Sequence, residues 1–182
     1  MKIAITGHSK GLGKALYDAL IKKGHTCYGF SRSNSYDITD QEDQKAIIHK
    51  AKDCDVFINN AWKDFAQEQL LDMIYDHWQT VEGKTIVLIN SRTRFGAGRN
   101  RLYTQSKKQL HFRTTKIFND NEKRCRIISI SPGYIKTEMT KAVHDKYNML
   151  TPEQCADMII WAMDQPQGIE IGELSCWRTT ID

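Results

Sequence analysis

The stretch Thr6-Gly-His-Ser-Lys-Gly-Leu-Gly13 decides how the chain is expected to fold. It follows residues 2–5, an apolar run typical of a strand, and precedes residues 12–23, whose apolar positions recur at helical spacing. Glycine tolerates a tight turn and lets backbone N–H groups approach an anion, while the helix N-terminus adds a positive dipole end. The pattern predicts a strand–turn–helix unit able to hold a pyrophosphate. The alternative is a glycine-rich turn without a ligand.

Strand-like and helical patterns alternate along the rest of the chain, which is typical of an α/β fold with a parallel sheet. Further strands are expected at residues 26–31, 56–59, 85–90, 126–131 and 172–177. Helices are expected at residues 39–52, where Thr39-Asp-Gln-Glu42 predicts a capping box, and at 64–81, 100–118 and from 151 onward, with Pro152 at the first helical position.

The connection after the second strand is too short for a complete unit. Only residues 32–36 separate it from Asp37-Ile-Thr-Asp40, whereas a parallel crossover needs a dozen or more residues. We therefore predict one domain over residues 1–182, a Rossmann-like doubly wound parallel sheet. One βα unit, in the region of the third strand, is expected to be reduced or missing.

Bulk composition is that of an ordinary soluble protein, with 182 residues, 40% hydrophobic and 26% charged. A formal charge of +4 is too diffuse to indicate nucleic acid binding. No apolar run approaches the ~20 residues that span a bilayer, and strand-like sequence begins at Lys2, so neither a membrane partner nor a signal peptide is expected. Five scattered cysteines without metal spacing suggest free thiols, no metal and a cytoplasmic location.

The end of the second strand, Ser31-Arg-Ser33, bears on cofactor choice. In dinucleotide-binding folds an acidic residue there prefers the ribose 2′-hydroxyl, whereas an Arg accommodates a 2′-phosphate. Arg32 is basic, and Lys10 lies in the glycine turn, so the pair favours NADPH/NADP over NAD. The alternative is that both are solvated surface charges.

Tyr103 and Lys107 lie four residues apart, on one face of one predicted helix. A nearby ammonium favours the phenolate and is expected to lower the pKa of the tyrosine toward a useful range. Tyr103 would then donate a proton to a carbonyl oxygen as hydride arrives, and Ser91 would hydrogen-bond that oxygen. The alternative is an ordinary helix with a half-buried Tyr and an exposed Lys.

Six ordered motifs make the chain resemble the short-chain dehydrogenases/reductases over nearly its whole length, as an unusually short member. They are Thr6-Gly-x3-Gly-x-Gly13, Asp37-Ile-Thr-Asp40, Asp55-x3-Asn-Asn-Ala61, Ser91, Tyr103-x3-Lys107 and Pro132-Gly-x3-Thr137. The resemblance implies Ser91, Tyr103 and Lys107 as catalytic residues. It implies cofactor contacts from Gly7, Ser9, Lys10, Gly11, Leu12, Gly13, Arg32, Asp37, Ile38, Asn59, Asn60, Ala61, Tyr103, Lys107, Pro132, Ile135 and Thr137.

The chain departs from the family pattern mainly in the substrate half. Trp62 stands where the family has Gly, and either narrows the pocket or turns outward. No counterpart of the family's helix Asn is evident, although Asp64 and Gln67 lie nearby, and the lid region 138–150 is brief. The arginines in this half are expected either to receive an anionic substrate or to be solvated: Arg92, Arg94, Arg99 and Arg101.

The resemblance leads to an NADPH-dependent reductase that converts a ketone or aldehyde to an alcohol, with a small or carrier-bound substrate. The alternatives are a cofactor-binding sensor whose catalysis has decayed and an NAD-dependent epimerase. A homodimer or higher homo-oligomer is expected through two helices with seven apolar positions: Leu70, Leu71, Ile74, Trp78, Leu110, Phe112 and Ile117. His111 is expected to be a packed or interface residue, and core packing is the favoured account of Tyr147, Trp161 and Trp177.

Overall fold

The computed structural model describes residues 1–96 and 100–179, and its centre is one six-stranded parallel sheet. The strand order is β2-β1-β3-β4-β5-β6. The chain therefore reverses its direction of travel across the sheet between β1 and β3, which is where open α/β sheets bind ligands. The strands are β1 (Lys2–Thr6), β2 (Thr26–Phe30), β3 (Val56–Asn59), β4 (Thr85–Ile89), β5 (Arg126–Pro132) and β6 (Ile171–Cys176).

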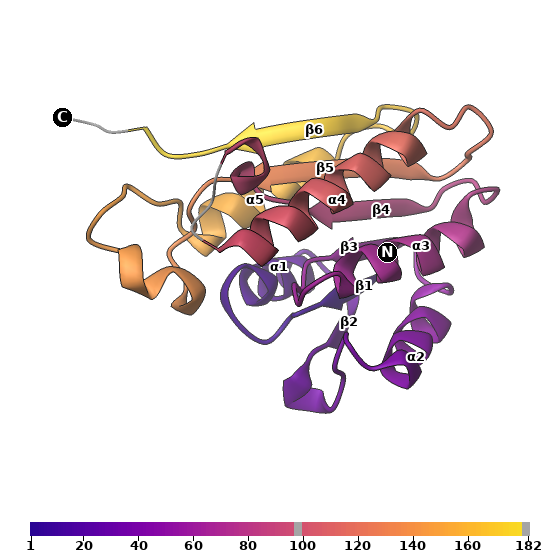
Figure 1. Cartoon of the computed structure of the whole chain (residues 1–182). Helices are drawn as coiled ribbons and strands as arrows, with labels where there is room; N and C mark the ends of the chain where they lie inside the picture. Colours follow the sequence, from indigo (N-terminus) through magenta and orange to yellow (C-terminus); the bar gives the residue numbers. More distant parts are fainter. Residues whose placement is uncertain (97–99, 180–182) are drawn as a thin grey trace.

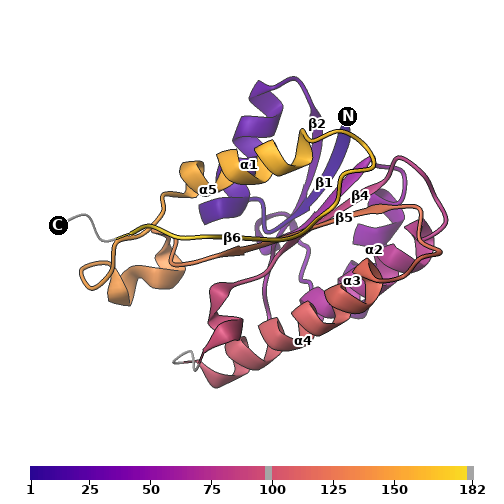
Figure 2. The ribbon, with the colours of Figure 1, turned by 90° about the horizontal axis from the view of Figure 1, so that it is seen from above.

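Helices cover both faces of the sheet, as the doubly wound prediction requires (Figures 1 and 2). One face carries α1 (Gly11–Lys22) and α5 (Pro152–Met163). The other carries α2 (Gln41–Ala51), α3 (Ala66–Trp78) and α4 (Arg101–Phe118). Three short 3-10 turns complete the described elements: η1 (Arg32–Asn34), η2 (Arg92–Phe95) and η3 (Glu138–Val143).

The prediction of a missing βα unit is confirmed. Strand β2 is followed only by η1 and an irregular segment before α2, so β2 forms one edge of the sheet. Helix α2 begins one residue later than the predicted capping box would place it. Its N-cap is Asp40, whose carboxylate accepts the N–H groups of Glu42 and Asp43 at 2.9 and 3.0 Å, so the prediction of Thr39 as the cap was wrong.

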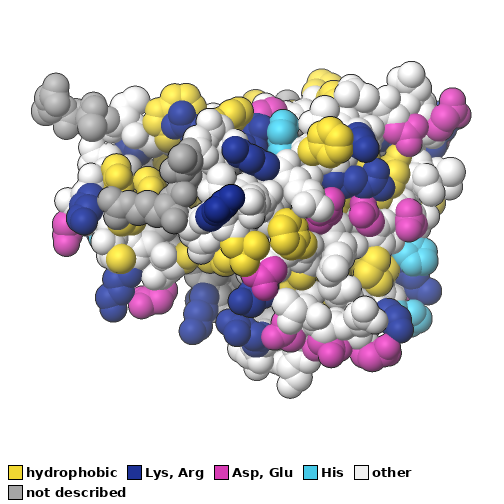
Figure 3. Space-filling model, viewed as in Figure 1, with side chains coloured by type: hydrophobic (Ala, Val, Ile, Leu, Met, Phe, Trp, Pro, Cys, Tyr) yellow, Lys and Arg dark blue, Asp and Glu magenta, His cyan; other side chains and the backbone are white. Residues whose placement is uncertain are grey.

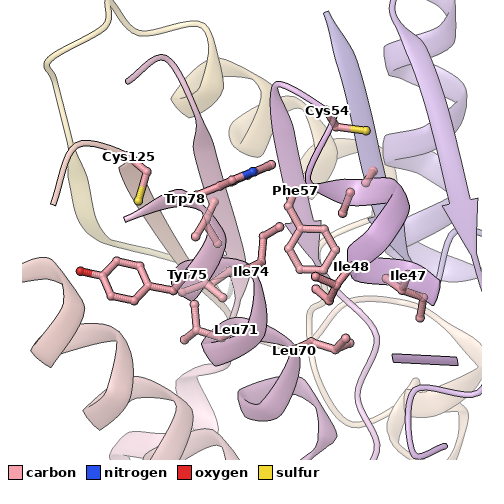
Figure 4. Close-up of a cluster of buried hydrophobic side chains, with 14 of the residues drawn as sticks. Ile47, Ile48, Cys54, Phe57, Leu70, Leu71, Ile74, Tyr75, Trp78 and Cys125 are labelled. Atoms are coloured by element: carbon pink, nitrogen blue, oxygen red, sulfur yellow. The ribbon is translucent and has the colours of Figure 1, made fainter. Parts of the chain in front are cut away.

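Most of the apolar residues proposed for a dimer interface lie in the core beneath α2, α3 and α4. Leu70, Leu71, Ile74 and Trp78 point inward against one another and against Phe57 of β3 (Figure 4). Leu110 and Ile117 of α4 are buried in the same cluster. Six of the seven apolar positions proposed for a dimer are therefore buried in the protein's own core, and they are not available to bind a second copy.

Phe112 is the seventh of those positions and is 61% exposed on α4. On the face that carries α3 and α4, apolar side chains lie scattered among charged and polar ones (Figure 3). The homodimer therefore stays a prediction, with Phe112 as its remaining apolar support.

Core packing was the wrong account of three late aromatic residues. Tyr147, Trp161 and Trp177 are 45%, 55% and 52% exposed. Tyr147 stacks on Tyr134 with ring centroids 4.7 Å apart, and Tyr134 is also 45% exposed. Within the described ranges, no helix is both long and apolar enough to cross a membrane.

Candidate cofactor and catalytic site

A cleft of ≈ 820 Å³ opens at the carboxyl ends of the strands, where the chain reverses across the sheet. It is lined by every residue predicted for the site except Asn59. Segments far apart in the sequence therefore converge on one cavity. The lining residues that were not predicted as site residues are Phe30, Ser31, Ser33, Tyr36, Trp62, Lys63, Ile89, Asn90, Gly133, Glu138, Met139 and Thr140.

The glycine turn has the geometry of a phosphate cradle. Gly7 and Gly11 have φ of 72° and 52°, in the left-handed region where L side chains are strained. The Gly7 N–H donates to the carbonyl of Phe30 at 2.7 Å, which ties the turn to β2. A Cβ on Gly13 would lie 2.0 Å from the Gly7 carbonyl oxygen, so α1 starts directly against the turn. The residues present therefore fit a dinucleotide pyrophosphate.

Replacing Gly13 with Ala is expected to weaken dinucleotide binding by more than about tenfold and to lower the melting temperature, because the Gly7 carbonyl must move. Isothermal titration with NADPH and thermal unfolding measure the two effects. Gly96→Ala is the matched control, since a Cβ there meets nothing within 4 Å. Equal affinities for the two variants would contradict the cradle.

Thr6 joins the glycine turn to the end of β3. Its hydroxyl oxygen accepts the N–H groups of Asn60 and Ala61, both at 3.0 Å. The Asn60 side chain returns a hydrogen bond to the Thr6 carbonyl at 2.9 Å. Asn59 is completely buried instead, and donates to the Gln67 carbonyl at 2.7 Å, so it supports the cleft from behind.

The end of the cleft beside β2 is basic. Lys10, Arg32 and Lys63 line it, and sequence reasoning missed Lys63 because it belongs to no recognised motif. Asp37 also lines this end, and its carboxylate accepts the Thr39 N–H and hydroxyl at 2.9 and 2.8 Å. These hydrogen bonds lower the pKa of Asp37.

Ser91 and Tyr103 come together in the cleft. Ser91 follows β4 and caps η2, accepting the Thr93 N–H at 3.2 Å, and its hydroxyl lies near enough to the Tyr103 phenol to influence the pKa of Tyr103. Burial is the largest influence on the phenol and raises the pKa of Tyr103, while the Ser91 hydrogen bond acts in the opposite direction. For the protein alone, the predicted lowering of this pKa is therefore wrong.

Lys107 explains that difference because its ammonium is held elsewhere. The Nζ atom lies 5.5 Å from the centre of the Tyr103 ring and donates to the Gln67 Oε1 atom and the Ile89 carbonyl, each at 2.7 Å. Burial lowers the pKa of Lys107 to about 7. The lysine is thus close to its midpoint at neutral pH.

Gln67 of α3, one of the two residues near the expected position of the family's helix Asn, binds Lys107. Its amide nitrogen donates to the carbonyls of Asn59 and Ile89 at 2.7 and 3.0 Å, which aims its oxygen at Lys107. Asp64, the other candidate, lies 3.7 Å from the Lys63 Nζ atom. A forty-residue separation hid the contact between Gln67 and Lys107 from sequence reasoning.

Trp62 lines the cleft and packs on α4. Its indole lies edge-on to the Tyr103 ring, with centroids 4.8 Å apart and planes at 88°. The indole N–H donates to the Ser106 hydroxyl at 2.8 Å, and Ser106 donates to the Tyr103 carbonyl at 3.0 Å. The large residue that replaces the family Gly therefore buttresses Tyr103 and narrows the site.

The arginines near Ser91 do not line the cleft where they are described. Arg94 is buried, forms an ion pair with Glu173 at 2.7 Å and donates to Ser131 at 3.2 Å. Arg92 stacks on Trp177, 3.8 Å from the ring centre. Arg101 is exposed at the start of α4, and Arg99 lies outside the described residues. Both earlier alternatives were therefore wrong for Arg94, which is structural.

His111 is half-buried, as the packing interpretation required. Burial lowers the pKa of His111, with a smaller contribution from Arg94.

Three further predicted cofactor residues line the cleft at and after the end of β5: Pro132, Ile135 and Thr137. Thr137 lies close to Gly11, since a Cβ there would be 3.1 Å from its methyl group.

The lid region is short but ordered against the sheet. The Thr140 hydroxyl donates to the Ile135 carbonyl at 2.6 Å, and Lys136 N–H donates to the Leu150 carbonyl at 2.8 Å. Glu138 and Met139 line the open side of the cleft.

A model of the NAD dependent epimerase/dehydratase family matches residues 3–131, which include the glycine turn, Ser91 and the Tyr-x3-Lys motif. The chain belongs to this family, and its fold is that of the short-chain dehydrogenases/reductases. No curated protein matches the sequence significantly.

Solved structures agree in fold at low sequence identity. A short-chain dehydrogenase from Burkholderia cenocepacia J2315 in complex with NADP has a TM-score of 0.82 at 21% identity, covering 96% of this chain and 86% of that one. An alcohol dehydrogenase from the archaeon Thermococcus sibiricus, complexed with 5-hydroxy-NADP, has a TM-score of 0.80 at 18% identity over 97% and 96%. The 3-alpha-hydroxysteroid dehydrogenase from Pseudomonas sp. B-0831, complexed with NADH, has 0.76 at 17% over 96% and 94%.

Proposed function

We propose that the protein is an NADPH-dependent oxidoreductase that reduces the carbonyl of a ketone or aldehyde to an alcohol. One observation carries the proposal: the glycine turn and the trio Ser91, Tyr103 and Lys107 line the same cleft. Structures with the same fold bind NADP or NADH, which supports a nicotinamide cofactor. The cofactor supplies the hydride, and the chain supplies binding, orientation and the proton.

The raised pKa of Tyr103 suits a proton donor in the direction of reduction, because the phenol stays protonated at neutral pH. Ser91 lies beside the phenol and would donate to the carbonyl oxygen as negative charge develops. The Lys107 ammonium donates to Gln67 and to the Ile89 carbonyl, so its contribution would be to hold the wall of the cleft beside Tyr103. Trp62 keeps the ring in position throughout.

Cofactor choice rests on the basic end of the cleft. Arg32 and Lys10 line it on the side of the β2 terminus, where a ribose 2′-phosphate would lie. Lys63 adds a third cation. A guanidinium binds phosphate through two parallel hydrogen bonds, so Arg32 is expected to contribute most.

Arg32→Ala is expected to raise the Kd for NADPH by about 10–100-fold and to change the Kd for NADH by less than about threefold. Trp62 lies in the wall of the cleft. Fluorescence energy transfer from tryptophan to the reduced nicotinamide therefore measures both Kd values. Exposed Lys136→Ala, outside the cleft, controls for a general loss of positive charge. An equal rise in the Kd values for NADPH and NADH would refute the assignment of Arg32 to the 2′-phosphate. If the unaltered chain binds neither cofactor, the reductase proposal is refuted.

The family description favours a second candidate, an NAD-dependent epimerase. That activity would call for NAD retained through purification, whereas a reductase exchanges its cofactor at each turnover. Extraction of the purified protein and chromatography of the released nucleotide separate the two. A decayed sensor, the third reading, would bind NADPH and turn over no carbonyl.

The brief segment between β5 and α5, in which η3 is the only described helix, supports a small or carrier-bound carbonyl substrate. A homodimer through α3 and α4 remains part of the proposal, with Phe112 at its centre. Light scattering of the chain and of Phe112→Ser tests it: a monomer in both cases would contradict the dimer.

A further inference from the structure

The missing βα unit leaves β2 as an edge strand whose outward backbone groups have lost a partner. The Phe30 carbonyl faces β1, since it accepts the Gly7 N–H at 2.7 Å. Successive residues of a strand alternate in direction, so the polar groups of Gly29 and Ser31 face the open side. In a sheet with one more strand, a neighbouring peptide group would bind them.

The side chain of Asn34 binds those groups instead. Its Oδ1 atom accepts the Ser31 N–H at 2.9 Å, and its Nδ2 atom donates to the Gly29 carbonyl at 2.8 Å. A carboxamide carries the same acceptor and donor as a peptide group. One side chain from η1 thus replaces one peptide group of the strand that the chain lacks.

These two bonds fold the segment after β2 back onto the strand end. The Ser31 carbonyl accepts the N–H groups of Asn34 and Tyr36 at 3.1 and 3.0 Å, and the Ser31 hydroxyl lies 2.8 Å from the Ser33 hydroxyl. Arg32 and Ser33 lie inside the closed turn and line the cleft. Residues 32–35 of the turn are exposed, and the turn is held by these bonds and by the edge-on contact of Tyr36 with Phe30.

We infer that Asn34 is a positioning residue for cofactor choice: its edge-capping amide fixes the turn that presents Arg32 and Ser33 to the 2′-phosphate of NADPH. The inference rests on the proposed function. Preorganisation is the physical reason, because a guanidinium on a loose turn must be ordered at the moment of binding and part of the interaction energy is lost. Asn34 does not itself line the cleft, so it acts through the turn.

The test compares Asn34→Ala with the unaltered chain, using adenosine 2′,5′-bisphosphate and adenosine 5′-monophosphate in isothermal titration. Both probes occupy the adenosine end, and they differ only in the 2′-phosphate. Loss of the two hydrogen bonds is expected to weaken the bisphosphate about five- to tenfold and the monophosphate less than about twofold. The Kd values for NADPH and NADH are expected to change in the same proportions.

Two variants separate positioning from a merely structural role. Asn34→Gln keeps an amide that can reach back to the Ser31 N–H, as Gln does in capping boxes, and is expected to restore most of the affinity. Ser35→Ala removes a neighbouring exposed side chain from the same turn and is expected to change neither constant. Thermal unfolding confirms that each variant is folded.

Equal weakening of both probes by Asn34→Ala, or no weakening of either, overturns the inference while leaving the reductase proposal standing. Failure of Asn34→Gln to recover bisphosphate binding overturns it as well. Failure of the unaltered chain to bind NADPH overturns the proposed function and this inference together.

Discussion

Tyr103→Phe is expected to reduce carbonyl turnover by about 10²–10⁴-fold, because the phenol is the proton donor and phenylalanine has none to give. The ring itself is retained, so the edge-on contact with Trp62, at 4.8 Å between centroids, survives the change. The Kd for NADPH is therefore expected to stay within about twofold. Loss of nicotinamide absorbance in single-turnover mixing, across a panel of small ketones and aldehydes, measures the effect.

Ser91→Ala is the companion variant. It removes the hydroxyl that lies beside the phenol and is proposed to donate to the carbonyl oxygen, and a loss of turnover of about 10–10³-fold is expected. The double variant is expected to lose little more turnover than Tyr103→Phe alone, because the two residues act as a unit. Turnover by Tyr103→Phe at the unaltered rate would remove Tyr103 from the mechanism, and no turnover by the unaltered chain with any carbonyl would favour the sensor.

The fold was predictable because its signals are local and repeated. Strand β3 has the bounds expected from its short apolar run, and the glycine turn lies between a strand and a helix, as expected. The absence of a unit after β2 was readable from the short connection, residues 32–36, between the second strand and Asp37. The helix cap was missed because Thr39 and Asp40 are both good N-caps, and Asp40 offers the carboxylate that two N–H groups share.

The supports of the site were not predictable in the same way. Gln67 reaches Lys107 and Trp62 reaches Ser106 only because α3 and the end of β3 pack against α4. Such contacts join residues about forty positions apart, and no periodicity encodes them. Arg94 was misjudged for a related reason: its charge suggested solvent, but Glu173 of a distant strand pairs with it in the interior.

Burial of Lys107 is expected to make the stability of the protein depend on pH. Its pKa is about 7 in the folded protein, well below the ordinary value of 10.5. Between these two values the unfolded chain binds more protons, so the free energy of unfolding is expected to rise as pH increases from about 7 toward 10. Below pH 7 both states are protonated, and the full cost of burying the ammonium is present.

Replacing the pair by apolar residues, Lys107→Met with Gln67→Leu, is therefore expected to stabilise the protein at pH 7 by roughly 1–4 kcal/mol and to flatten the dependence on pH. Gln67→Leu alone is expected to destabilise, since the ammonium then keeps only the Ile89 carbonyl. Urea unfolding of the three chains from pH 6 to 9 measures these differences. A double variant less stable than the unaltered protein would show that the pair supports the fold.

The expected gain in stability has a functional meaning. A buried lysine that weakens the fold at neutral pH needs a compensating use, and promoting proton loss from Tyr103 during turnover is one. Gln67→Glu tests this use directly. A carboxylate beside the Lys107 Nζ atom is expected to raise the pKa of Lys107 and to shift the pH profile of turnover to higher pH. If turnover keeps its pH profile in Gln67→Glu while stability shifts as expected, Lys107 is a burden on the fold with no part in the proton transfer.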